Sequence, residues 1–144
     1  MDIIEFIANV LEPISSEGIT CVQGWYDSNI NDTHITFCEL SDRSNDVSDD
    51  LEENIEHTIQ VDIWSKEDEW QLKKEVKKLM VQADFGYIEG QDFYETETGI
   101  YHKALRFNFI EKLKQVKDYG YYRIYSKCIR TNFIYWNSNR SRLV

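Results

Sequence analysis

The chain has 144 residues, of which 42% are hydrophobic and 14% aromatic, so it is long enough for one folded domain with a buried core. Its 26 acidic residues outnumber 16 basic ones, and a net charge of −10 disfavours a general nucleic-acid binder, which usually presents a basic face. No apolar stretch approaches the ~18 residues of a membrane span. Cys21, Cys38 and Cys128 form no CxxC pair, which argues against a zinc ribbon or a disulfide framework and favours a reducing, cytosolic compartment.

The first predicted elements are a helix and two strands. Apolar residues recur at helical spacing over residues 3–14, and Pro13 and Gly18 close this helix. Residues 20–26 and 33–40 then alternate between apolar and polar side chains. The short polar segment between them predicts that the two strands form a hairpin.

A second helix is predicted directly after Ser65. The Ser65 hydroxyl can accept a backbone N–H of the first turn, and acidic residues 67–69 place negative charge at the positive end of the helix dipole. Glu69 and Lys73 are spaced for an ion pair one turn apart, and Gly86 is expected to end the helix. The predicted buried stripe consists of Leu72, Val76, Leu79, Met80 and Ala83.

The remaining strands complete an α+β fold. Residues 54–65 alternate before the second helix, and residues 87–95 and 101–112 alternate after it. Because tight polar turns join most neighbours, we expect a mainly antiparallel sheet of about five strands with both helices on one face. Residues 1–112 are expected to form this single domain, and residues 113–144 a C-terminal extension, either an added strand or an interface arm.

Charge divides sharply between these two parts. Residues 1–112 hold 25 acidic and nine basic residues, a net charge of −16, whereas residues 113–144 hold seven basic and one acidic, a net charge of +6. The extension is also rich in aromatic residues, a combination that suits single-stranded nucleic acid. It equally suits a strand, over residues 123–136, that packs against this domain or a neighbour. The acidity of the rest of the chain favours the protein contact, without specific nucleic-acid binding.

No spacing typical of a catalytic or metal site is present. His34, His57 and His102 fall in predicted strands and show no HExxH, HxH or His–Cys spacing, so they are interpreted as ordinary strand side chains. The sequence also lacks a nucleophile elbow, an SxxK pair and a glycine-rich phosphate loop. We therefore expect no enzyme, and no catalytic, cofactor-binding or metal-binding residues.

The acidic segment 42–53 partly matches a calcium-loop template. Positions 1, 3, 5, 7, 9 and 12 of the template are filled by Asp42, Ser44, Asp46, Ser48, Asp50 and Glu53. However, Val47 stands where the sharp turn needs glycine, and strands are predicted on both sides where the template has helices. A solvated acidic loop over residues 41–56 is the expected structure, without specific calcium binding.

Four segments resemble phage tail completion proteins. Residues 59–65, IQVDIWS, precede a charged amphipathic helix ending at residues 78–80, KLM. Members of that family likewise follow a strand of the form VDIWS with a charged helix. Residues 92–98, DFYETET, and 101–109, YHKALRFNF, resemble the family's last two strands. The resemblance covers about residues 1–112 in element order.

The resemblance implies a structural protein of a long-tailed phage or prophage. Such proteins are similar to tail terminators and tail-to-head joining proteins, which close the tail tube as a ring, typically of six subunits, and meet the head connector. It implies no cofactor, partners among tail tube and connector proteins besides the chain itself, and a location in the host cytoplasm during assembly and then in the virion tail. Members usually end soon after the last strand, whereas this chain continues for 32 residues past Lys112.

Charge also suggests where an interface would lie. A ring of head-to-tail contacts needs two complementary surfaces on each subunit, which the −16 and +6 parts offer. The expected interface residues are Asp46, Asp49, Asp50, Glu52, Glu53, Trp64, Arg123, Lys127 and Arg130. A second hypothesis suits the same charge: an acidic immunity or antitoxin protein that blocks a basic toxin, with fast, electrostatically steered association.

Overall fold

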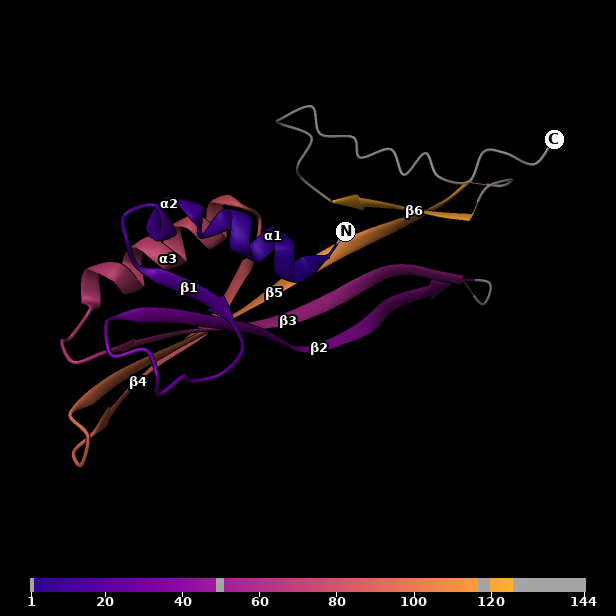
Figure 1. Cartoon of the computed structure of the whole chain (residues 1–144). Helices are drawn as coiled ribbons and strands as arrows, with labels where there is room; N and C mark the ends of the chain where they lie inside the picture. The colour runs from indigo at the N-terminus through magenta and orange to yellow at the C-terminus, as the bar shows by residue number, and fades with distance from the viewer. Residues whose placement is uncertain (1, 49–50, 117–119, 126–144) are drawn as a thin grey trace. The chain divides into compact units, whose positions relative to one another are not determined.

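The computed structural model describes residues 2–48, 51–116 and 120–125, and side chains over residues 2–44 and 54–113. The elements are α1 (Ile3–Val10), α2 (Glu12–Ser15), β1 (Thr20–Gln23), β2 (His34–Ser48), β3 (Leu51–Ser65), α3 (Trp70–Gln82), β4 (Gly86–Glu95), β5 (Ile100–Val116) and β6 (Gly120–Tyr125). The strands form one sheet in the order β1-β2-β3-β5-β4, with β6 paired to β5 (Figure 1). The predicted α+β class with a mostly antiparallel sheet is confirmed.

The chain divides into two compact units. Unit 1 comprises Met1–Asp42 and His57–Phe109, and it contains the helices, β1 and β4. Unit 2 comprises Arg43–Glu56 and Ile110–Val144. Within unit 2, β5 and β6 pair antiparallel in six consecutive registered pairs from Glu111↔Tyr125 onward.

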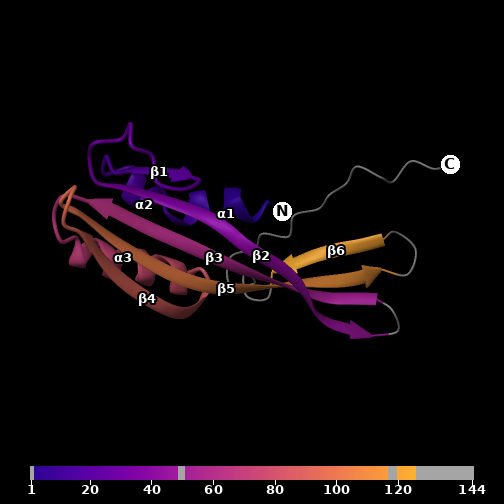
Figure 2. The ribbon, with the colours of Figure 1, turned by 90° about the horizontal axis from the view of Figure 1, so that it is seen from below.

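The core of unit 1 lies between the helices and one face of the sheet. Every second strand residue points to that face. The strand residues on that face that are fully or almost fully buried are Ile35, Phe37, Ile59, Val61, Ile63, Leu105, Phe107 and Phe109. From α1, the Phe6 ring lies 5.5 Å from Phe85 and 5.6 Å from Phe109 between centroids. Figure 1 shows α1, α2 and α3 on this face, and Figure 2 views the sheet from below, where no helix covers it.

The predicted hairpin of the first two strands is wrong. β1 and β2 are neighbours, but they run parallel, in register from Thr20↔His34 to Gln23↔Phe37. The chain leaves β1 at Gly24, whose φ of 128° is readily available only to glycine. The Gly24 N–H donates to the Phe37 carbonyl over 3.0 Å. The following residues return the chain to the starting end of the pair, because parallel strands require such a crossing connection.

The predicted start of the second helix is also wrong. α3 begins at Trp70, and its N-cap, Glu69, makes no side-chain capping bond. Ser65 instead ends β3: its hydroxyl oxygen accepts the Glu67 N–H over 3.1 Å and lies 2.7 Å from the Thr33 hydroxyl. A serine that can cap a helix can equally hold a turn after a strand, and here the second arrangement is adopted.

The C-terminal end of α3 differs from the prediction at Gly86, which is the first residue of β4. The helix is terminated by Asp84, with φ of 71°, followed by a Phe85 N–H bond to the Met80 carbonyl over 3.1 Å. Of the predicted stripe, Leu72, Val76 and Met80 are buried, whereas Leu79 and Ala83 are only half-buried.

The predicted acidic loop at 41–56 is largely strand. β2 extends to Ser48 and β3 begins at Leu51, so a hairpin replaces most of the loop. Asp42, Ser44, Asp46 and Ser48 therefore lie along an extended strand that rises about 3.3 Å per residue, and not in the compact turn on which the calcium-loop template depends. Arg43 closes this hairpin within unit 2, donating from Nε and Nη2 to Glu56 Oε2 over 2.9 and 2.7 Å.

Candidate functional site

The face of the unit 1 sheet opposite the helices carries four rings in a line, hereafter the aromatic row. Tyr26, from the β1–β2 connection, lies 4.7 Å from Trp64 of β3 between ring centroids. Trp64 stacks on His102 of β5 at 3.7 Å and 8°, and His102 lies 5.4 Å from Phe93 of β4. The row therefore joins one connection and three strands that are far apart in sequence.

Strand alternation explains why these rings share a face. Trp64 follows the core residue Ile63, so it points to the opposite side of the sheet, as the sequence predicts. Phe93 and His102 are directly registered partners in the β4–β5 ladder, which places their side chains side by side. The Trp64 indole N–H is also satisfied, since it donates to Thr36 Oγ1 over 3.0 Å.

A buried carboxylate lies beneath the row. Asp62, with 1% of its surface exposed, accepts from His102 Nε2 over 2.7 Å. The Gln60 amide also donates to both Asp62 oxygens over 3.0 Å. These bonds compensate the loss of hydration that burial imposes on the carboxylate. The sequence pattern does not reveal this pair, although an aspartate between the core residues Val61 and Ile63 was an available signal.

The Asp62–His102 pair resembles the orienting half of a nucleophilic site, and within the described residues the hydrogen-bond partner of the His102 ring is Asp62. The two ring neighbours of His102 are Trp64 and Phe93. Burial, with a smaller contribution from the charge of Asp62, raises the pKa of the Cys38 thiol. Burial likewise raises the pKa of Cys21 to about 11, so both thiols stay protonated and poorly nucleophilic at neutral pH.

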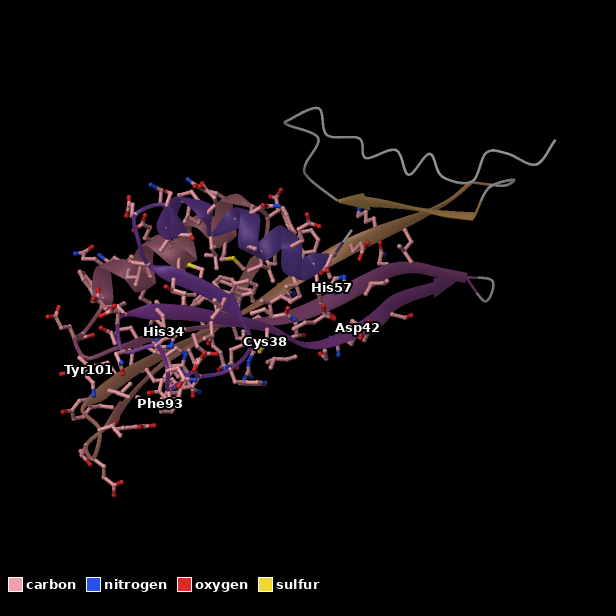
Figure 3. All side chains as sticks on the ribbon, viewed as in Figure 1. His34, Cys38, Asp42, His57, Phe93 and Tyr101 are labelled. Atoms are coloured by element: carbon pink, nitrogen blue, oxygen red, sulfur yellow. The ribbon has the colours of Figure 1, made fainter. Side chains whose placement is uncertain are left out.

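The three histidines have separate partners. His34, with 1% of its surface exposed, places Nδ1 2.9 Å from the Asp32 carbonyl and lines a cavity of about 80 Å³ that Tyr26 and Trp64 share. His57 Nδ1 lies 3.5 Å from Glu39 Oε2, and Figure 3 shows it well separated from His34. Within residues 2–44 and 54–113, no three His, Cys, Asp or Glu side chains are grouped as a metal site.

An ion-pair cluster lies on the helix side of the sheet. Lys103 of β5 is 4% exposed, and its Nζ lies 2.6 Å from Asp68 and 3.3 Å from Asp92. Asp92 also accepts from Lys73 of α3 over 2.7 Å, in place of the predicted Glu69–Lys73 pair. Burial lowers the pKa of Lys103, but the hydrogen bonds that its ammonium donates to Asp68 and Asp92, together with the charges of these carboxylates, outweigh burial, and the net pKa is raised. The cluster fixes the loop before α3 and strand β4 to β5.

This cluster predicts a dependence of stability on acid. The hydrogen bond from Lys73 holds the pKa of Asp92 below its ordinary value. The ionised Asp92 side chain therefore stabilises the folded protein at pH values above that ordinary pKa, and this stabilisation is lost as the pH falls through the pKa of the folded state. We expect Asp92→Asn to lower the free energy of unfolding by about 0.5–1 kcal/mol at pH 7, because the pair is half exposed, and by less near pH 3. Urea unfolding at the two pH values measures this, with the exposed carboxylate variant Glu17→Gln as control; an equal loss at both values would contradict it.

The predicted interface residues belong to different elements of the chain. Trp64 lies in the aromatic row, whereas Asp46, Glu52, Glu53 and Arg123 lie on unit 2 strands. Asp49, Asp50, Lys127 and Arg130 fall outside the described residues. Within unit 2, residues 43–56 carry a net charge of −5 and residues 110–144 a net charge of +6, so the unit is nearly neutral. The negative charge of the chain therefore belongs to unit 1, whose net charge is −11.

Comparisons with known protein families and with curated proteins identified no relative of this chain. No model of a known protein family matches the chain, and no curated protein has a significantly similar sequence. None of the described helices is long and apolar enough to cross a membrane. A functional proposal therefore stands on the sequence pattern and on the geometry of the aromatic row.

Proposed function

We propose that this chain is a non-enzymatic structural protein of a phage or prophage tail, which closes the tail tube as a ring and joins it to the head connector. One observation carries the proposal: the segments that resemble tail completion proteins pack against one another. The IQVDIWS segment ends β3, the charged helix is α3, and the other two segments belong to β4 and β5.

The contacts among these segments are specific. Asp62 and Trp64 of the first segment both contact His102 of the last. Phe93 contacts the same histidine, and its neighbour Asp92 accepts from Lys73 of α3. Residues that define the resemblance therefore also hold β3, β4, β5 and α3 together. This supports the view that the pattern reflects a shared fold and did not arise by chance.

The surface of unit 1 is compatible with assembly. Large apolar side chains remain exposed at Trp25, Tyr26, Leu40, Trp70, Val81, Ile88, Phe93 and Tyr94. Three of these eight lie on β4 and two at the start of the β1–β2 connection. Exposed apolar side chains on β4 and on the β1–β2 connection are available for contacts with other proteins. Further copies of the chain, typically six in a ring, tail tube proteins and the head connector are the proposed partners.

The proposal is tested by locating the protein in phage particles. We expect gold-labelled antibody against the chain to bind at the head–tail junction of particles induced from the strain that carries the gene. A strain lacking the gene should release separate heads and tails, and a plasmid copy should restore joined particles. Joined particles without the gene would overturn the proposal. Neutralisation of a basic toxin by the purified chain would instead favour the antitoxin hypothesis.

A further inference from the structure

The outer edge of β4 is a long edge of the sheet that is unpaired in the described part of the chain. β4 is ten residues long and pairs with β5 on one side, and no described strand pairs with its other side. A register shift at Ile88 leaves a regular stretch from Glu89 to Glu95. A long regular edge strand offers a row of backbone N–H and C=O groups to an added strand. At the other end of the sheet, β1 has only four residues.

The side chains on β4 suit a partner strand with apolar residues on both faces. Phe93 is 47% exposed and Tyr94 54% exposed, and as neighbours in a strand they project to opposite faces. Tyr94 is steadied by Tyr101 of β5 at 4.7 Å between ring centroids, as Phe93 is by His102. Both faces of the edge therefore present a positioned, half-exposed ring.

Charge selects a basic partner. The stretch 86–99 contains four acidic residues and no basic one. Asp92 and Glu89 are paired with Lys73 and Arg106, which leaves Glu95 and Glu97 near the turn. Because unit 1 as a whole carries −11, a cationic strand is attracted to this edge at long range.

The chain itself contains a segment with these properties. Residues 120–144 hold five basic residues and no acidic one, together with six aromatic residues. The segment begins with strand β6, and 19 residues follow Tyr125, enough to run along the seven-residue regular part of β4. Residues 133–136, FIYW, would offer apolar side chains to both faces at once.

We propose that residues 126–144 of one copy, the part of this segment that follows β6, add as a strand to the outer edge of β4 in a second copy. This inference rests on the proposed function, since a ring needs a contact that joins two different surfaces of identical subunits. Backbone hydrogen bonds provide the affinity, and the exposed rings and opposite charges select the segment.

Crosslinking at one native and one engineered cysteine tests this contact. The segment contains Cys128, and Tyr94→Cys places a thiol on β4. Treated with a short bismaleimide, which tolerates differences in strand register, the full-length Tyr94→Cys protein is expected to form covalent dimers and longer species on a denaturing gel. Removing Cys128 with Cys128→Ser should reduce them at least fivefold. Cys21 and Cys38 react slowly, because burial raises the pKa of both thiols.

A matched control and a peptide complete the test. Val81→Cys on α3, where Val81 is 47% exposed, should give no such species. A synthetic peptide of residues 120–144 should crosslink to full-length protein carrying Tyr94→Cys and Cys128→Ser, and Phe93→Cys serves if Tyr94→Cys fails to fold. Equal crosslinking at residue 81, a link confined to one chain, or no peptide adduct would each overturn the inference. None of these results affects antibody labelling at the head–tail junction, so the two proposals fail separately.

Discussion

Replacing Phe107 by alanine is expected to lower the free energy of unfolding by about 3–5 kcal/mol, as is usual when a fully buried aromatic side chain is removed. Phe107 has 0% of its surface exposed. Its ring packs edge-on against Phe85 at 6.5 Å and Tyr87 at 5.6 Å between centroids. The loss is a large fraction of the ~5–15 kcal/mol that stabilises a typical domain, and urea unfolding at pH 7 measures it.

The matched control is Phe93→Ala, which deletes the same side chain from the uncovered face. Phe93 is 47% exposed, so we expect a loss below about 1 kcal/mol. The difference between the two variants tests which face of the sheet is buried. Similar losses at both positions would show that the helix-covered face has been assigned wrongly.

Strand alternation made much of the fold predictable from the sequence. It identified the core residues of β2, β3 and β5, and it placed Trp64 on the opposite face. Alternation is the same in parallel and antiparallel pairs, however, so it could not reveal that β1 runs parallel to β2. The length of β2 and β3 was missed because acidic residues between 41 and 56 are unusual in strands and favour a loop prediction.

The candidate site was less predictable, because its contacts depend on strand register. Trp64 and His102 were each recognised as strand residues, yet their stacking follows from the neighbouring positions of β3 and β5 in the sheet. Lys103 shares a face with Leu105 and Phe107, so its burial could have been inferred from alternation. Its partners Asp68 and Asp92 could not, since they come from a loop and from the other strand of the hairpin.

The second large effect is expected at the buried carboxylate. Asp62→Ala should lower the free energy of unfolding by about 2–4 kcal/mol, because it removes a charge-assisted hydrogen bond from His102 and leaves the Gln60 amide without its acceptor. Glu89→Ala is the matched control: Glu89 likewise pairs with a β5 side chain, that of Arg106, over 3.2 Å, but the Glu89 side chain is 48% exposed. We expect that variant to lose less than about 1 kcal/mol in the same urea measurement.

A double-mutant cycle separates the Asp62–His102 bond from the stacking of the row. His102→Phe keeps a ring between Trp64 and Phe93 but removes the nitrogen that Asp62 accepts from. Asp62→Ala combined with His102→Phe should therefore be more stable than the sum of the single losses predicts, by about 1 kcal/mol or more, since the double variant leaves neither Asp62 nor the His102 nitrogen without its partner. If the losses in unfolding free energy of the two single variants simply added up in the double variant, the Asp62–His102 bond would contribute no coupling energy. Because Asp62 lies on β3 and His102 on β5, a coupled pair would link these two neighbouring strands through their side chains as well as through the backbone ladder.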